Sequence, residues 1–365
     1  MHIPFCLKKC NYCDFCSYSS LDTQTSEKYI SQLINEIHSY KRDEKIAVDT
    51  IFFGGGTPSL LEPLEFFRIC DAIENTFSIL SGVEFSIEAN PKTLTREKLK
   101  AFVSRGVNRV SIGLQTIHEN ERKILGRIHD FSDFKEAVTL VKECGISNFG
   151  VDLMYGIPEQ TKESFYETLK TVLSFEPTHI SAYGLIIEEG TPIFNNRKKL
   201  SFPSEDEECD MYDMACRTLS HNGYLHYEVS NYAKPGCESR HNKKYWNMSE
   251  FIGVGVSAYS YFEGKRFGNS RDISEYISPA SEQYRYEEIC KSENLAFEFV
   301  MLGLRTSEGI SLSEYKSLFG EDFLHSRENA VNKYISLGYM QKINGRISLT
   351  EKGFYVSNTI LTDLL

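Results

Sequence analysis

Four of the ten cysteines lie within the first sixteen residues, at Cys6, Cys10, Cys13 and Cys16. The first three have the spacing C-x3-C-x2-C, so one short loop can turn three thiolates toward a common centre. Iron–sulfur clusters are held by thiolates, whereas Mg2+ and Ca2+ take oxygen ligands. Three thiolates on a four-iron cluster leave one iron open to another ligand. The spacing therefore predicts a [4Fe–4S] cluster on Cys6, Cys10 and Cys13, with an open position for chemistry.

A zinc site is the main alternative for this loop, because Cys13 and Cys16 have the C-x2-C spacing of zinc knots. With Cys16 as the fourth ligand, the loop would be a closed structural site without redox chemistry. Cys16 can equally be a buried thiol. A disulfide framework is disfavoured, because the other six cysteines are scattered singly and the chain shows no signal peptide.

Length and charge narrow the class of protein. A chain of 365 residues is long enough for one large α/β domain and a smaller one. No apolar run approaches a membrane span, and a net charge of −11 argues against binding to a phosphate backbone. The unpaired cysteines indicate a reducing compartment, so we expect a cytoplasmic protein without a nucleic-acid partner or an integral membrane segment.

Predicted strands and helices alternate along the first half of the chain, and a polar residue or a glycine run follows most strands. The strand over 48–53 runs into Gly54-Gly55-Gly56-Thr57, where bare backbone lets a ligand approach the main chain closely. The strands over 83–87 and 109–114 end at Glu88 and Gln115, and the strand over 149–153 carries Asp152. We expect helices over 26–40 (with Ser26 as the N-cap), 62–77, 95–105, 132–145 and 162–174, and a strand over 179–185.

This alternation predicts an α/β fold with a parallel sheet covered by helices, in which sites collect at the carboxyl ends of the strands. We therefore predict a partial (β/α) barrel whose mouth is lined by the cysteine loop, Gly54–Thr57, Glu88, Gln115, Arg127 and Asp152. Taken singly, Glu88, Asp152 and Arg127 would be solvated surface residues and Gln115 a hydrogen-bonded buried amide. Their repeated position at strand ends favours a binding role.

Six stretches occur in the order found in one group of radical S-adenosylmethionine (SAM) proteins: MHIPFCLKKCNYCDF, FFGGGTPSLL, SIEANP, SIGLQT, LGRIH and DLMYGIPEQT. The chain resembles this group, which contains the oxygen-independent coproporphyrinogen III oxidase HemN and the haem chaperone HemW. The resemblance implies that Cys6, Cys10 and Cys13 hold a [4Fe–4S] cluster whose free iron is chelated by SAM. Carried over by motif, the SAM-binding residues are Gly55, Gly56, Thr57, Glu88, Gln115, Arg127 and Asp152.

Two features are more similar to HemW than to HemN. Cys13-Asp14-Phe15 stands where HemN has C-x-C, and residues 241–246 match the H-N-x-x-Y-W motif associated with haem binding in HemW. The resemblance implies that His241 is an axial ligand of haem iron, beside Tyr245 and Trp246, with Cys237 as a rival ligand. Without the resemblance, a histidine beside the only tryptophan would be interpreted as a packed loop anchor.

Two positions depart from the family pattern. A tyrosine that contributes to SAM binding in the family would fall before Met1 here, and Tyr259 stands where many members have a histidine.

The rest of the chain is expected to extend the barrel and to end in a small domain. Residues 296–365 resemble a winged helix, with a hairpin around Asn344-Gly345. Seven Lys and Arg against eight Asp and Glu in that stretch argue against DNA, so we expect a packing or lid role. Further elements are expected as a helix over 203–220, strands over 224–229 and 251–256, helices over 297–304, 311–319 and 327–337, and hairpin strands over 338–342 and 346–349.

The predicted domains are a radical SAM partial barrel over 1–195, a barrel extension with the H-N-x-x-Y-W motif over 196–295, and a winged-helix-like α+β domain over 296–365. The resemblance implies a haem chaperone that carries SAM on its cluster, binds haem and transfers it to haem-dependent respiratory proteins. The alternative is an oxygen-independent coproporphyrinogen III oxidase, which decarboxylates a porphyrinogen through a radical derived from SAM. A zinc-stapled binding module is the third hypothesis. No catalytic residue is assigned, and homodimer formation stays open.

Overall fold

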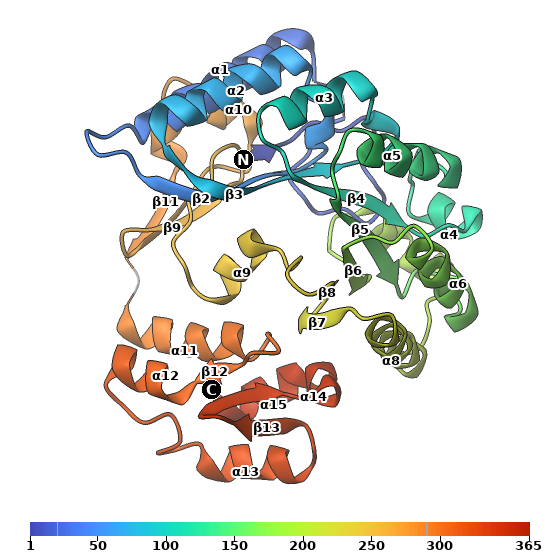
Figure 1. Ribbon diagram of the computed structural model, residues 1–365, viewed down its shortest axis with the longest axis vertical. Coiled ribbons are helices and arrows are strands. Elements are labelled where there is room, and N and C mark those ends of the chain that lie inside the picture. The colour runs from blue at the N-terminus through green and yellow to red at the C-terminus, as the bar shows by residue number, and fades with distance from the viewer. Residues whose placement is uncertain (20, 290) are drawn as a thin grey trace. The chain divides into compact units, whose positions relative to one another are not determined.

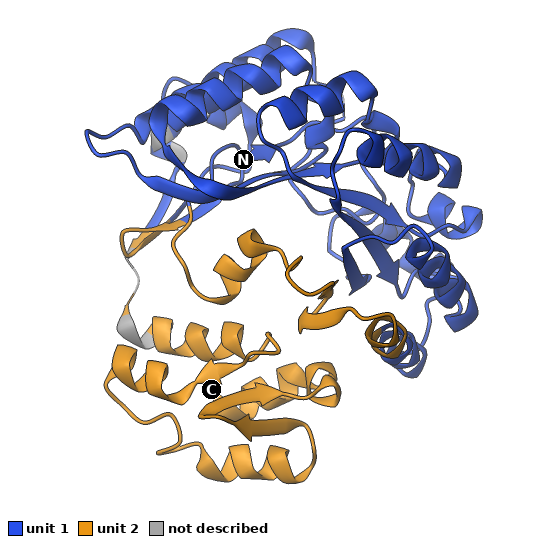
Figure 2. Ribbon diagram, in the orientation of Figure 1, with its two compact units in different colours: residues 1–215, 252–260, 267–287 blue, residues 216–251, 261–266, 288–365 orange. Residues whose placement is uncertain are grey.

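The computed structural model describes residues 1–19, 21–289 and 291–365 (Figure 1). The chain forms two compact units (Figure 2), of which unit 1 comprises residues 1–215, 252–260 and 267–287, and unit 2 comprises 216–251, 261–266 and 288–365. Within the described ranges, no helix is long and apolar enough to cross a membrane. The three-part division predicted from the sequence stays a prediction.

Unit 1 is built on parallel strands that follow one another across the sheet in chain order. This order matches the predicted alternation of strands and helices. The strands are β1 (His2–Ile3), β2 (Ala47–Gly55), β3 (Ser78–Ala89), β4 (Arg109–Gln115), β5 (Asn148–Tyr155) and β6 (His179–Gly184).

Helices connect these strands, as Figure 1 shows. The predicted N-cap at Ser26 is wrong, because the first helix begins at Thr23, after Asp22, whose carboxylate accepts a hydrogen bond from the Thr25 amide at 2.9 Å. The helices are α1 (Thr23–Ser39), α2 (Pro63–Thr76), α3 (Arg96–Ser104), α4 (Glu119–Ile124), α5 (Phe131–Glu143), α6 (Lys162–Leu173) and α7 (Pro192–Asn196).

The two faces of this sheet differ in chemistry. Phe53 of β2 packs against Phe66 of α2 with ring centroids 5.4 Å apart, and Phe66 packs against Phe102 of α3 at 4.7 Å. Neighbouring residues of a strand point to opposite faces, so Glu88, Ser111 and Asp152 alternate with buried residues of their own strands, Ile87, Val110 and Val151. The register pairs Glu88 with Ser111 and Asp152 with Ser181, so polar side chains from four strands share the other face.

The predicted strand over 251–256 is wrong. Only Phe251 makes a bridge, to Tyr261, and residues 252–256 form no strand. Gly255 has a φ of +112°, outside the region that L-residues adopt in strands. The other elements after β6 that carry residues of unit 1 are α8 (Glu205–His221), β9 (Tyr259–Phe262), β10 (Lys265–Gly268), α10 (Ile273–Tyr276) and β11 (Tyr286–Ile289).

Unit 2 contains a three-stranded antiparallel sheet in the order β12–β14–β13. The predicted hairpin is confirmed, with Asn344 and Gly345 at φ values of +51° and +74° in the turn. Its elements are β7 (Leu225–Glu228), β8 (Asn231–Ala233), α9 (Arg240–Trp246), α11 (Ser292–Gly303), β12 (Ile310–Ser311), α12 (Leu312–Phe319), α13 (Glu328–Ser336), β13 (Met340–Ile343), β14 (Arg346–Leu349), α14 (Glu351–Tyr355) and α15 (Ser357–Leu364).

Candidate functional site

The cysteine loop lies directly after β1, and its three predicted ligands are half-buried free thiols. Cys6 Sγ lies 3.6 Å from Thr57 Oγ1, and Cys10 Sγ lies 3.6 Å from Arg127 Nη1. Burial raises the pKa of the Cys13 thiol, and the nearby Cys10 and Cys6 raise it further. The three thiols therefore influence one another electrostatically, and they lie next to Thr57 and Arg127, two other predicted site residues.

The described residues contain no group of three His, Cys, Asp or Glu side chains that would hold a single metal ion. A four-iron cluster makes a different demand, since each thiolate binds a different iron and the sulfurs need not converge on one point. Three reduced thiols on one loop, with a guanidinium beside one of them, fit such a cluster.

Asn11, between Cys10 and Cys13, holds the loop to the rest of unit 1. Its amide N–H donates to the Leu125 carbonyl at 2.9 Å, and its Nδ2 donates to the Ile124 carbonyl at 2.8 Å. Its own carbonyl accepts from the Ile193 amide at 2.9 Å. The loop is therefore fixed to the turn that leads from α4 into Arg127, a contact that the sequence analysis missed.

The glycine run at the end of β2 lies against the start of the cysteine loop. The Gly54 amide donates to the Met1 carbonyl at 3.0 Å, and the Gly56 amide donates to the Ile3 carbonyl at 2.8 Å. A Cβ atom on Gly56 would lie 2.8 Å from the Phe5 carbonyl oxygen, so this position has no room for a side chain. The glycines thus allow two backbones to approach each other, as well as leaving main chain accessible.

Glu88 and Asp152 lie on the polar face of the sheet, where both are half-buried. Glu88 Oε2 accepts from the Gly55 amide at 3.1 Å, and Asp152 Oδ1 accepts from the Ser111 hydroxyl at 3.0 Å. Burial raises the pKa of Glu88 to about 7, and the charge of Asp152 adds to that shift. Burial also raises the pKa of Asp152. A cationic ligand group would favour the charged form of both acids.

Arg127 and Gln115 complete the set of residues at this edge. Arg127 Nη1 lies 3.4 Å from Tyr12 Oη, and Nη2 donates to the Gly113 carbonyl. Gln115 is buried at a φ of +73°, where its Oε1 accepts from the Tyr183 hydroxyl at 2.9 Å. The structure thus places each predicted SAM-binding residue in unit 1, around the ends of β2 to β5.

Sequence reasoning missed the residues that hold these side chains in place. Ser111 and Ser181 flank Asp152, and Tyr183 holds Gln115. Strand register was the only available signal, because parallel pairing places Ser181 opposite Asp152. Asn90, which follows β3, has a buried Oδ1 without a hydrogen-bond partner among the described residues and was also missed.

The H-N-x-x-Y-W motif lies on α9 in unit 2. Ser239 caps this helix by accepting a hydrogen bond from the Asn242 amide at 3.2 Å. His241 and Tyr245 are four residues apart on one helix face, with His241 Nε2 2.9 Å from the Tyr245 hydroxyl. Tyr245 also packs edge-on against Phe251, with ring centroids 4.7 Å apart. Tyr245 is 41% exposed, so this aromatic surface is accessible.

Comparison with known families agrees with this arrangement. The Radical SAM superfamily model matches residues 1–172, and the HemN C-terminal domain model matches residues 291–356. The solved structure of coproporphyrinogen III oxidase (HemN) from Escherichia coli, a radical SAM enzyme, is similar with a TM-score of 0.84 and 23% identity, covering 100% of this chain and 88% of that one. The predicted radical SAM α/β fold is thereby confirmed.

Several relatives of higher sequence identity are named as haem chaperones. "Heme chaperone HemW" from Lactococcus lactis is 34% identical, over 100% of this chain and 96% of that protein. The HemW proteins of Bacillus subtilis and Escherichia coli are each 32% identical, over 99% of this chain and 97% and 96% of theirs. Because such relatives match along nearly their whole length, the chain belongs to the HemW family of haem chaperones within the radical SAM superfamily.

Proposed function

We propose that this protein is a cytoplasmic haem chaperone that carries SAM on a [4Fe–4S] cluster, binds haem in unit 2 and passes it to haem-dependent respiratory proteins. Full-length similarity to HemW proteins is the observation that carries this proposal. The other possible function, coproporphyrinogen oxidation, is supported by likeness of fold to HemN at 23% identity and by the match of residues 291–356 to the HemN C-terminal domain model.

Cys6, Cys10 and Cys13 would hold the cluster through their thiolates. Glu88 and Asp152 would accept hydrogen bonds from cationic or hydroxyl groups of SAM, and Arg127 would donate to its carboxylate. Gly55, Gly56 and Thr57 would leave main chain open to the methionine part, and Gln115 would offer an amide. When bound, the cluster supplies an electron and a coordination site for SAM.

His241 would be the axial ligand of haem iron. It is half-buried on α9 in contact with the exposed Tyr245 ring, and the half-buried Trp246 ends the same helix. An imidazole supplies a nitrogen ligand, while flanking aromatic rings bury the apolar face of a macrocycle. The same helix carries Lys244 and Lys243, and a haem propionate would have to replace the Glu308 carboxylate that lies 3.0 Å from Lys243 Nζ.

The test is an anaerobic haem titration of the cluster-reconstituted protein, followed by Soret absorbance, with a coproporphyrinogen decarboxylation assay on the same sample. We expect saturable binding near one haem per chain and no decarboxylated product. His241→Ala should weaken haem binding at least tenfold. His221→Ala is the matched control, because His221 is an exposed histidine of unit 2 outside the motif, and it should bind haem as the parent does.

Decarboxylated product together with weak, unsaturable haem binding would replace this proposal with the oxidase. Unchanged haem affinity in His241→Ala would refute the ligand assignment while leaving the chaperone role intact. A visible spectrum without iron–sulfur absorbance, together with one zinc per chain, would support the zinc module.

A further inference from the structure

The segment that follows Ile252 lies beside β1, on the side opposite β2. On the β2 side, the carbonyls of Met1 and Ile3 accept hydrogen bonds from the Gly54 and Gly56 amides of the glycine run. The backbone of the intervening residue, His2, points the other way. Its amide donates to the Val254 carbonyl at 2.8 Å, and its carbonyl accepts from the Tyr29 hydroxyl at 2.7 Å.

Four backbone groups of residues 254–256, including the Val254 carbonyl, form hydrogen bonds within unit 1. The Gly255 amide donates to Glu36 Oε2 at 2.9 Å, and the Val256 amide donates to the Tyr29 hydroxyl at 3.2 Å. The Gly255 carbonyl accepts from Asn269 Nδ2 at 2.8 Å. Gly255 has no room for a side chain, since a Cβ atom would lie 2.6 Å from the Tyr29 hydroxyl oxygen.

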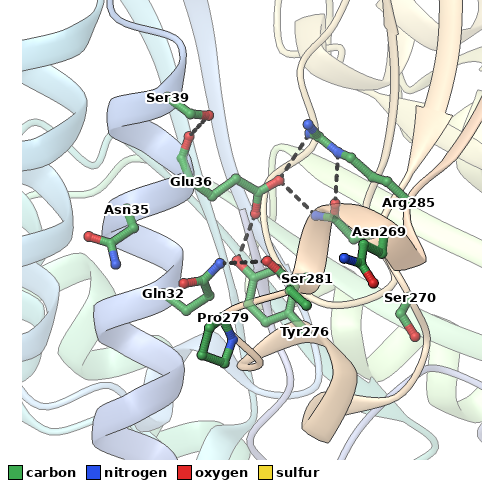
Figure 3. A pocket seen from close by; sticks show the side chains of 12 residues that line it. Gln32, Asn35, Glu36, Ser39, Asn269, Ser270, Tyr276, Pro279, Ser281 and Arg285 are labelled. Carbon is green, nitrogen blue, oxygen red and sulfur yellow. Dashed lines mark hydrogen bonds and ion pairs between the residues drawn. The ribbon is translucent and has the colours of Figure 1, made fainter.

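Glu36 is the centre of this contact (Figure 3). Only 9% of the residue is exposed, and its carboxylate accepts hydrogen bonds from the Gly255 amide, the Tyr276 hydroxyl at 2.7 Å and Asn269 Nδ2 at 2.7 Å. Arg285 completes the set with Nη2 at 3.3 Å from Oε1. A buried carboxylate is tolerated only when donors and a counter-charge surround it, and Glu36 has both.

The donors to Glu36 come from sequence positions more than two hundred residues away from it. Tyr29 and Glu36 are seven residues apart, so they share one face of α1 and contact the same tripeptide. Helix α1 thus joins the 252–260 and 267–287 segments of unit 1 to β1, and β1 leads within three residues into Cys6.

A second set of contacts joins the same segment to the cysteine loop itself. The Arg271 carbonyl accepts from the Cys16 thiol and from the Tyr18 hydroxyl, each at 3.1 Å. Arg271 Nη2 lies 3.2 Å from Asp14 Oδ2, an exposed ion pair of small energetic weight. The buried Glu36 network is therefore the stronger of the two attachments.

We propose that Glu36 is a positioning residue for the cluster loop, because it fixes the 254–256 segment that pairs with His2 on the open side of β1. Through β1, Glu36 sets the position of Cys6 and of the Gly54–Gly56 run. The inference rests on the proposed cluster and SAM function, but its first test does not need either group.

A pocket of about 350 Å3 adjoins Glu36, lined also by Asn269, Tyr276 and Arg285 (Figure 3). Water can reach the network from this pocket once the carboxylate no longer binds its donors. Glu36→Gln retains size, but its NH2 group must face either Asn269 Nδ2 and Arg285 Nη2 or the Gly255 amide, and all of these are donors themselves. The variant should therefore release the segment from α1 without leaving a large cavity.

The first test is amide hydrogen exchange on the full chain without cluster or SAM. Glu36→Gln should speed exchange at least tenfold in peptides covering residues 1–13 and 253–260. The control is Leu99→Ala, which removes a fully buried side chain of α3 in the same unit. At an equal loss of melting temperature, this control should leave both peptides unchanged.

The second test is SAM affinity at equal iron content, for which we expect a tenfold loss in Glu36→Gln and no change in Leu99→Ala. If Glu36→Gln does not fold, Tyr276→Phe can replace it, because it removes one donor to Glu36. It should change amide exchange and SAM affinity in the same direction but by smaller factors. The inference would be overturned if a folded Glu36→Gln variant exchanged the amides of residues 1–13 at the same rate as the parent. A parent protein that takes up neither iron nor SAM would instead refute the proposed function, and the exchange result would still decide the role of Glu36.

Discussion

Arg127 lies beside Cys10, with its Nη1 3.6 Å from the thiol sulfur. The other two nitrogens of the guanidinium differ in their partners. Nη2 donates to the Gly113 carbonyl, whereas the buried Nε has no hydrogen-bond partner among the described residues. An unmade hydrogen bond at a buried donor costs about 1–3 kcal/mol. Arg127 therefore has an unused donor for an anionic ligand group, next to one of the three predicted cluster ligands.

Replacing Arg127 by alanine should weaken SAM binding by about 10- to 100-fold, because a hydrogen bond to a charged group contributes about 1.5–3 kcal/mol. Iron content should stay near that of the parent, since Arg127 is not a ligand. Equilibrium dialysis of SAM against the reconstituted protein would measure the change. Arg68→Ala removes an exposed arginine paired with Glu27 and serves as the control. Equal affinity in Arg127→Ala and Arg68→Ala would contradict the assignment.

Glu88 should make SAM affinity depend on pH. Burial raises the pKa of Glu88 to about 7, so the free site is largely neutral below that pH, and a bound ammonium group favours the carboxylate. SAM affinity should rise between pH 6 and 7.5, and Glu88→Gln should bind more weakly with little dependence on pH. Because the folded pKa is raised, the contribution of Glu88 to stability is present below pH 4.5 and lost as pH rises through 7. A pH profile of Glu88→Gln parallel to that of the parent would exclude this role.

The Asp152 carboxylate should lower the stability of the free protein and raise its affinity for SAM. Burial raises the pKa of Asp152, so its charged form is disfavoured by folding at neutral pH even though Ser111 donates to it. Asp152→Asn removes that charge and should raise the melting temperature of the SAM-free protein while weakening SAM binding about tenfold. Calorimetry and dialysis on one preparation would measure both changes. Loss of stability together with unchanged SAM affinity would assign Asp152 a purely structural role.

The strand-end residues were predictable because the sheet follows the chain in order. A parallel sheet of this kind puts the carboxyl end of each strand at the same edge. The proximity of Glu88 and Asp152 could therefore be predicted from strand order alone. The exact position of each side chain along this edge could not be predicted. A register shift between Gly113 and Gln115 places Gln115 at a φ of +73°, and no residue type in that stretch indicates it.

Contacts between residues far apart in the sequence could not be predicted from the sequence either. Asn11 reads as a loop residue in the C-x2-C spacing, and only the fold brings it to the carbonyls of Ile124 and Leu125. Residues 252–256 alternate like a strand but form none, because Gly255 is fixed in a left-handed conformation against Tyr29 and Glu36. Periodicity describes local geometry, whereas these contacts depend on tertiary structure.

Gly126, in the turn before Arg127, and Gly106, in the turn after α3, are a matched pair for mutation. Gly126 has a φ of +71°, and a Cβ atom there would lie 2.7 Å from Asn11 Oδ1; Gly106 has a φ of +92° and open space around it. Both alanine variants should lose stability from backbone strain, by about 1–2 kcal/mol each. Only Gly126→Ala should displace Asn11 and lower iron incorporation. Equal iron content in the two variants, measured per folded chain, would show that Asn11 does not control the loop.

Tyr245 gives the haem proposal its most specific test. His241 Nε2 lies 2.9 Å from the Tyr245 hydroxyl, and the two rings are nearly perpendicular at 87°. Iron cannot bind a nitrogen that is engaged by a hydroxyl, so ligation through Nε2 must first break this hydrogen bond. A typical intramolecular hydrogen bond contributes about 0.5–1.5 kcal/mol, which corresponds to about 2- to 13-fold in affinity.

Tyr245→Phe should therefore bind haem a few-fold more tightly than the parent, since it keeps the ring that packs against Phe251 and removes only the competing hydroxyl. Soret titrations of Tyr245→Phe and of Tyr355→Phe, an exposed tyrosine of α14 outside the motif, would measure the difference. Weaker binding in Tyr245→Phe alone would mean that the hydroxyl itself contacts haem, or that Nδ1 is the ligand and the Tyr245 hydrogen bond orients the ring. The double variant His241→Ala/Tyr245→Phe separates those two cases. If the hydroxyl contacts haem directly, its loss weakens binding further in the His241→Ala background, whereas an orienting hydrogen bond has no effect once the imidazole is gone.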